Sequence, residues 1–322
     1  MMRELIAVAI AMAAVAAMSA AEAQTYPSRT ITLVVPFPPG GSTDVVGRII
    51  AERMQPLLGQ PVIIENVGGA GGSTGVGRVA RAAPDGYTID VGQWDTHVGS
   101  IIFKLNYDLE KDFAPIGLMS VNPMLMVGKK ELPANDLAGL VVWMKANPAK
   151  ALFINQNAAA QISGILLQQA TGTQLTLVPY RGAGPAMTDL LAGHVDLIVT
   201  SAAAVLPQVQ AGTLKPIANL SPRRSPIMPD IPTPEEFGVQ GLHMSGWFGL
   251  FAPRGTPGDI IGKLNATMVQ VLAEPTVRTR FTQLGLDVAS REQQTPEGLA
   301  AFQKAEIEKW WPIIKAAGVK SE

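Results

Sequence analysis

The same order of elements occurs twice along this chain, and this repetition constrains the fold more than any other feature. Each copy alternates strand, loop, helix, strand, loop, helix and strand. The first copy is predicted to hold strands at 31–35, 61–65 and 87–91 and helices at 42–58 and 73–82. The second is predicted to hold strands at 151–154, 175–180 and 195–199 and helices at 161–171 and 185–192. Short crossovers of this kind build mainly parallel sheets flanked by helices, which predicts an α/β protein with two similar lobes.

Two apolar segments are predicted to connect these lobes. Residues 113–127 cross into the second lobe, and residues 245–253 return to the first. We therefore expect lobe 1 to comprise 24–122 with 247–322, and lobe 2 to comprise 123–246. Two connections between the lobes favour a hinge about which the lobes close on each other. Open α/β sheets bind ligands at the loops that follow their strands. The ligand cleft is expected between the lobes, with tail helices at 259–272, 277–284 and 296–317 packing back on lobe 1.

Residues 1–23 resemble a cleaved secretory signal peptide. Arg3 precedes an apolar run, and Ala21-Glu22-Ala23 forms a small-residue cleavage site. The mature chain is then expected to be exported to the periplasm. Removing Arg3, Glu4 and Glu22 from 25 basic and 26 acidic residues leaves 24 of each, so no basic face for nucleic acid is indicated. Cysteine is absent, so packing alone must hold the lobes together.

The loop between the first strand and helix could form an anion site. The apolar strand 31–35 runs into Pro36-Phe37-Pro38-Pro39, then two glycines, then Ser42-Thr43-Asp44. A helix that begins here presents free backbone N–H groups, although an ordinary capped corner has the same pattern. Residues 155–163 occupy the equivalent place in lobe 2. One such loop on each wall suits a small carboxylate, with Asp44 expected to face and brace the neighbouring loop.

Enzymatic and metal-binding alternatives have weaker support. Residues 71–75 match G-x-S-x-G, and with Asp196 and His243 they could form the triad of an exported serine hydrolase. The preceding strand ends eight residues before Ser73, however, so Ser73 is expected to be a helix N-cap. The G-x-G-x-x-A pattern at 75–80 lies inside a predicted helix. His97, His194 and His243 are widely separated, so neither a metal nor a cofactor is expected.

Distinctive short motifs run along the whole mature chain. They include 35–44 (VPFPPGGSTD), 84–88 (PDGYT), 112–116 (DFAPI), 179–182 (PYRG), 189–193 (DLLAG), 229–233 (PDIPT) and 247–253 (WFGLFAP). In this order they resemble the Bug family, the periplasmic solute receptors of tripartite tricarboxylate transporters. The resemblance implies a type II periplasmic binding protein of the Venus flytrap type, and no enzyme. It implies capture of a small carboxylate, such as a dicarboxylate or an aromatic acid, by a monomer that delivers it to inner-membrane permease subunits. Delivery to a membrane sensor kinase is an open alternative.

The resemblance also places the ligand loops at 37–44, after the third strand, and at 155–163. The expected ligand-binding residues are Phe37, Gly40, Gly41, Ser42, Thr43, Gln93, Trp94, Thr96, Asn155, Asn157, Ala159, Ala160, Gln161, Ser163 and Thr200. Two loops depart from the family pattern. Residues 154–163 read INQNAAAQIS in place of a glycine- and serine-rich turn, and Gln93-Trp94-Asp95-Thr96 replaces small residues. Trp94 could stack on an aromatic ligand or form a hydrophobic plug between the lobes.

Overall fold

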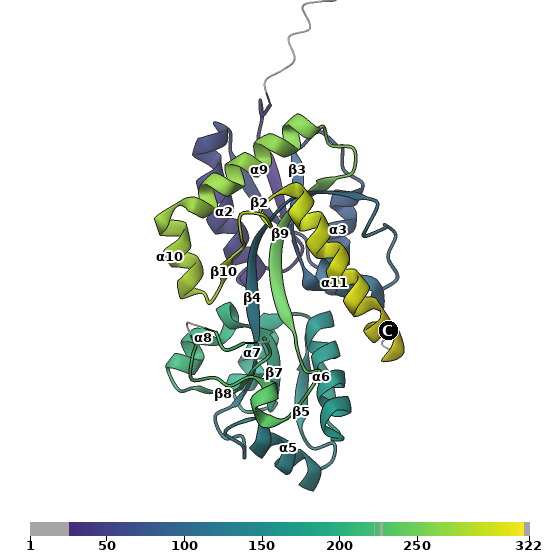
Figure 1. The fold of residues 1–322 in the computed structure, drawn as a ribbon, viewed down its shortest axis with the longest axis vertical. Helices are drawn as coiled ribbons and strands as arrows, with labels where there is room; N and C mark the ends of the chain where they lie inside the picture. Colours follow the sequence, from purple (N-terminus) through teal and green to yellow (C-terminus); the bar gives the residue numbers. More distant parts are fainter. Residues whose placement is uncertain (1–25, 222, 226–227, 319–322) are drawn as a thin grey trace, which may run out of the picture.

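A computed structural model describes residues 26–221, 223–225 and 228–318, and shows two lobes, each a sheet flanked by helices (Figure 1). The predicted signal peptide lies outside the described residues. Within the part of the chain that is described, no helix has the length and hydropathy of a membrane span. The expected two-lobed α/β architecture is confirmed.

Lobe 1 carries the upper sheet in Figure 1, with strand order β2-β1-β3-β9-β4. Its first three strands are parallel to one another, and β9 runs antiparallel to both of its neighbours, β3 and β4. The strands are β1 (Ile31–Val35), β2 (Val62–Asn66), β3 (Thr88–Gln93), the first part of β4 (Phe113–Lys129), β9 (Ser245–Pro253) and the short β10 (Asp287–Val288). The helices are α2 (Ser42–Leu58), η1 (Ala70–Gly72), α3 (Ser73–Ala80), α4 (Trp94–His97), η2 (Gly99–Ile102), α9 (Gly258–Ala273), α10 (Pro275–Gln283) and α11 (Pro296–Ala316).

Lobe 2 continues the same sheet path through β4-β7-β5-β6, and β8 also pairs with β4. Strands β5, β6 and β7 are parallel, as the alternating pattern predicted. The strands are β5 (Leu152–Asn155), β6 (Thr176–Pro179), β7 (Leu197–Ser201) and β8 (Leu214–Asn219). The helices are α5 (Leu137–Ala146), α6 (Ala158–Thr171), α7 (Ala183–Leu191), α8 (Ala202–Gln210) and η3 (Pro234–Phe237).

Strands β4 and β9 join the two lobes. From Phe113 to Pro123, β4 pairs with β9 in an antiparallel ladder. From Met124 onward it pairs instead with β7 and β8. This change of partner supports the proposed boundary between lobe 1 and lobe 2 at 122/123. Both strands run vertically between the lobes in Figure 1, where a hinge must bend.

Apolar packing, with no disulfide anywhere in the chain, holds this arrangement. Helix α2 shows the pattern, because Val46, Ile49, Ile50 and Met54 lie on one face at helical spacing and are all buried on the lobe 1 sheet. A further cluster is shared by both lobes. It includes Trp94, Phe153, Trp247, Leu299 and Trp310. The lobes therefore contact through apolar side chains as well as through the two connecting strands.

The structure corrects three local predictions in the loops. Residues 158–160 belong to α6, where a loop was predicted up to residue 160, because alanine favours helix and the Asn157 side chain caps the helix by accepting from the Ala160 N–H. Helix α7 begins at Ala183, so Pro185 is its third residue and not its first. After β3, residues 94–97 form the short helix α4 and not an open loop.

Gly92 on β3 tests the close packing between the lobe 1 strands. A Cβ at this position would lie 2.5 Å from the Phe251 ring and 2.8 Å from His97 Cε1. Gly92→Ala should therefore destabilise the fold by about 1–3 kcal/mol, measured by urea unfolding. Gly262→Ala in α9 is the control, because nothing lies within 4 Å of its Cβ and alanine should gain up to about 1 kcal/mol there. Equal stabilities for the two variants would contradict this packing.

Candidate functional site

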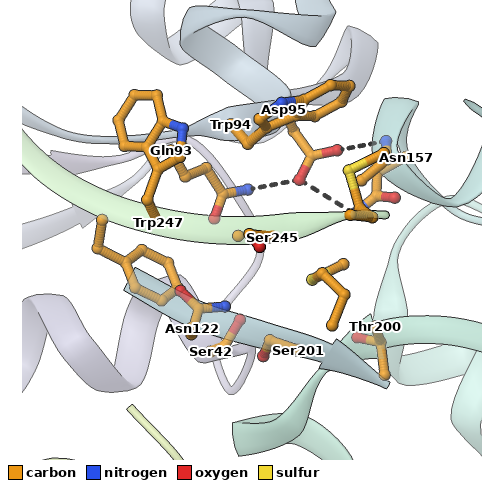
Figure 2. Close-up of a pocket in the computed structure, with 15 residues that line it drawn as sticks. Ser42, Gln93, Trp94, Asp95, Asn122, Asn157, Thr200, Ser201, Ser245 and Trp247 are labelled. Atoms are coloured by element: carbon orange, nitrogen blue, oxygen red, sulfur yellow. Dashed lines mark hydrogen bonds between the residues drawn. The ribbon is translucent and has the colours of Figure 1, made fainter. Parts of the chain in front are cut away.

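A cleft opens where β4 and β9 pass between the lobes (Figure 2). It contains about 400 Å³ of empty space, part of it open to solvent. Lobe 1 contributes Ser42 from the start of α2 and Gln93 from the end of β3, and lobe 2 contributes Asn157, Thr200 and Ser201. Within the described part of the chain, none of the residues that line the cleft is a lysine, an arginine or a histidine.

The N-terminus of α2 forms one wall of this cleft. Its N-cap residue is Gly41, which has extended backbone (φ −79°) and offers no side chain to the first-turn N–H groups. Ser42, the first helical residue, lines the cleft. An uncapped helix N-terminus carries partial positive charge and favours a negatively charged group. The predicted anion loop of lobe 1 therefore reaches the cleft through Ser42, and its binding of an anion stays a prediction.

Asp44 braces the loop before α2, as predicted. It is buried and accepts hydrogen bonds from the Gly40 N–H, Arg48 Nε and Asn66 Nδ2, each 2.9 Å long. Burial alone would raise its pKa, but these three donors together hold the pKa of Asp44 below its ordinary value. Asp44 is therefore ionised at neutral pH, and the Gly40 N–H is engaged within the protein.

A chain of polar contacts links α2 to lobe 2. The Thr43 hydroxyl donates to Gln93 Oε1 (2.7 Å), and Gln93 Nε2 donates to Asp95 Oδ2 (3.2 Å). Asp95 also accepts the Ala159 backbone N–H on Oδ1 (2.8 Å) and Asn157 Nδ2 on Oδ2 (3.3 Å), as Figure 2 shows. Ala159 is the second residue of α6, so a lobe 1 carboxylate binds the N-terminus of a lobe 2 helix.

Burial raises the pKa of Asp95 to about 6, although the Ala159 N–H acts in the opposite direction. The side chain is 6% exposed. Sequence reasoning overlooked this residue and named its three neighbours Gln93, Trp94 and Thr96 instead. The available signal was an acidic side chain two residues after a strand that ends at the cleft.

The cleft brings together six of the fifteen predicted ligand-binding residues. These are Ser42, Gln93, Trp94, Asn157, Ala159 and Thr200. The other nine do not line it. They are Phe37, Gly40, Gly41, Thr43, Thr96, Asn155, Ala160, Gln161 and Ser163. Several of these nine are engaged inside the protein, because Thr43 binds Gln93, Thr96 forms a capping box with Gln93, and the Ala160 N–H donates to Asn157.

Trp94 packs as a plug beside the cleft. It is 1% exposed, and its ring meets the Trp310 ring of α11 edge to face, with centroids 5.2 Å apart. A Cβ at Gly99 would lie 2.5 Å from the Trp94 ring and 3.0 Å from the Ala158 Cβ. These contacts support the plug interpretation of Trp94, since the indole is held between α11, η2 and α6.

Four buried polar atoms around the cleft have no hydrogen-bond partner within the described part of the chain. They are Trp94 Nε1 on α4, Asn122 Oδ1 on β4, Ser201 Oγ on β7 and Trp247 Nε1 on β9. All four residues line the cleft and are less than 10% exposed. Buried polar groups are normally satisfied, so a cluster of unsatisfied ones at one cavity points to a bound polar molecule or to water. Sequence reasoning predicted Trp94 but not the other three.

The residues of the hydrolase alternative do not form a triad. Ser73 is the first residue of α3, after the N-cap Gly72, and its hydroxyl donates to the Ala70 carbonyl. Asp196 accepts the Leu152 N–H and pairs with Lys129. His243 pairs with Glu235. Across the described residues there is also no group of three histidine, aspartate or glutamate side chains that could hold a metal ion.

Comparison with known proteins identifies the family. The sequence profile described as "Tripartite tricarboxylate transporter family receptor" matches residues 46–319. The chain belongs to this family. BugT of Bordetella pertussis is 35% identical to this family member over 320 residues, covering 98% of this chain and 97% of BugT.

Two solved structures show the same fold at similar identity. MatC from Rhodopseudomonas palustris, with bound malate, has a TM-score of 0.85 at 38% identity and covers 90% of this chain and 100% of its own. A second R. palustris protein, with adipate, has a TM-score of 0.86 at 31% identity and covers 92% of this chain and 99% of its own. The family comprises solute-binding receptors, so the receptor prediction is confirmed and the enzyme alternative is not supported.

Asp95 should make stability depend on pH in a defined direction. Its pKa is about 6 in the folded state, against an ordinary value of 3.8. At a pH below both values Asp95 is protonated in the folded and the unfolded state, so it adds no pH dependence to the free energy of unfolding. As the pH rises from about 4 to about 7, the wild type should lose about 3 kcal/mol of unfolding free energy relative to Asp95→Asn. Urea unfolding of both proteins across this pH range measures the difference. Glu131→Gln, on an exposed turn, controls for net charge, and parallel curves for Asp95→Asn and wild type would contradict this assignment.

Proposed function

We propose that this receptor captures a small carboxylate in the cleft between α2 and lobe 2. The observation that carries the proposal is the uncapped α2 N-terminus, with Ser42 on the cleft wall and the unsatisfied atoms of Asn122, Ser201 and Trp247 around the same space. The helix N-terminus suits an anionic group, and the neutral polar atoms suit the rest of a small polar molecule. Family members with bound malate and adipate support the choice of a carboxylate.

No lining residue in the described part of the chain is cationic, so a carboxylate in this cleft would be held by dipoles. Backbone N–H groups, hydroxyls and ordered water can hold a carboxylate without a full opposing charge. Such a site binds less tightly than an arginine fork, which allows a transport receptor to release its ligand. The apolar residues Met124, Met244 and Phe248 also line the cleft and suit a short carbon skeleton.

The family name supports a transport partner for this receptor. We propose that the chain acts as a monomer in the periplasm, after removal of 1–23, and delivers the carboxylate to inner-membrane permease subunits. Hinge closure about β4 and β9 would present a different surface to the permease in the loaded state.

Ligand screening by thermal shift tests the proposed function. At about 100-fold above the Kd, a carboxylate that binds only the folded protein should raise the Tm by about 5 °C. The screen should contain aliphatic mono- and dicarboxylates, aromatic acids, sugars and amines. A rise with a sugar or an amine, with no response to any carboxylate, would contradict the proposal.

Gly41 tests where the ligand carboxylate binds. The Gly41 Cβ position has only the Pro38 carbonyl oxygen at 4.0 Å, and its φ suits any residue, so a side chain fits. Gly41→Asp should cap α2 itself and thereby weaken carboxylate binding by about tenfold or more, while stability stays equal or rises. Gly41→Ala is the matched control and should bind like the wild type by calorimetry. Unchanged affinity in Gly41→Asp would place the carboxylate elsewhere.

A further inference from the structure

The N-terminus of α6 already holds a carboxylate that belongs to the protein. Asp95 Oδ1 accepts the N–H of Ala159 at 2.8 Å, and the Asn157 side chain accepts the next N–H, that of Ala160, at 2.9 Å. Two of the first-turn donors that a ligand anion would use are therefore engaged. The second wall of the expected carboxylate clamp is filled from lobe 1.

A free ligand competes poorly for this position. Asp95 is attached to the same chain, and Gln93 Nε2 and Asn157 Nδ2 both donate to its second oxygen. An intramolecular group held in place has a high effective concentration relative to a dilute ligand. Removing Asp95 from α6 would also leave the Ala159 N–H unsatisfied in a buried place.

The charge of Asp95 acts on whatever enters the cleft. Asp95 lines the cleft, and among the residues that the structure describes no lining side chain is cationic and could neutralise it. Two negative charges close together in a buried site repel strongly, because little water screens them. A ligand with one carboxylate can place that group at the α2 N-terminus, away from Asp95. A ligand with two carboxylates finds no second anion position in the cleft, because Asp95 already occupies the N-terminus of α6.

The remaining polar atoms of the cleft are neutral. The unsatisfied atoms of Trp94, Asn122, Ser201 and Trp247 comprise two indole N–H groups, one carbonyl oxygen and one hydroxyl. An amide or a hydroxyl on the ligand can both donate to and accept from such groups, whereas a carboxylate can only accept. This lining favours a neutral polar group at the second end of the ligand.

We propose that Asp95 determines specificity by occupying the α6 anion position, so that the cleft selects monocarboxylates with a neutral polar end over dicarboxylates. This inference rests on the proposed function and narrows its ligand class. The ligand proposed for this chain differs from malate and adipate, the ligands of two solved family members, because each of those carries two carboxylates.

Isothermal titration calorimetry with isosteric ligand pairs tests the proposal. Succinamate is compared with succinate, and adipamate with adipate, at a pH well above the pKa of Asp95, because each pair differs only in an amide or a carboxylate at one end. Of the two monoamides, the one that the wild type binds more tightly should have a Kd at least about tenfold lower than the dicarboxylate of the same pair. Asp95→Asn should reduce this ratio by about tenfold or more, mainly by improved dicarboxylate binding.

Control variants distinguish a failure of the specificity proposal from a failure of the proposed function. Asp95→Ser provides a second neutral variant if the asparagine protein does not fold, and Glu131→Gln should keep the wild-type ratio. A wild type that prefers the dicarboxylate, or a ratio unchanged in both Asp95 variants, overturns the specificity proposal alone. A wild type that binds no member of either pair and no carboxylate in the thermal screen overturns the proposed function as well.

Discussion

The antiparallel ladder between β4 and β9 is the constraint on which the rest of the structure depends. These two strands belong to the lobe 1 sheet, and β4 then changes its partners to β7 and β8 without leaving the strand conformation. Both lobes are therefore parts of one hydrogen-bonded path, and the cleft opens where that path passes between them. Relative movement of the lobes must bend this ladder, because no flexible linker replaces it.

Asp95 adds a second, polar connection across the same gap. The contacts from Thr43 through Gln93 and Asp95 to Ala159 join the N-termini of α2 and α6, the two helix ends that face the cleft. The two ends are therefore not equivalent. One is uncapped and available, whereas the other is satisfied by the protein. A buried carboxylate with a raised pKa carries an energetic cost, and costs of this kind are common at binding sites.

Periodicity predicted the framework well, because α2, β1 and the three tail helices are long or strongly patterned segments. The boundaries of α2 and β1 match the prediction, and α11 differs from it by one residue. The loops were predicted less well. The capping of α6 by Asn157 and the helical turn at 94–97 depend on side-chain hydrogen bonds that periodicity does not reveal. Asn122, Ser201, Trp247 and Asp95 reach the cleft from strands and a short helix that are distant in sequence, so only the tertiary fold brings them together.

The absence of cysteine has a practical consequence for measuring how the lobes move. No native thiol competes with an introduced one, so a pair of engineered cysteines can carry spectroscopic labels at two chosen positions only. Ile63 on β2 and Val142 on α5 are exposed by 50% and 70% and lie in different lobes. Labels at these two positions would report the interlobe distance in solution, with and without ligand, while leaving the cleft and the Asp95 contacts untouched.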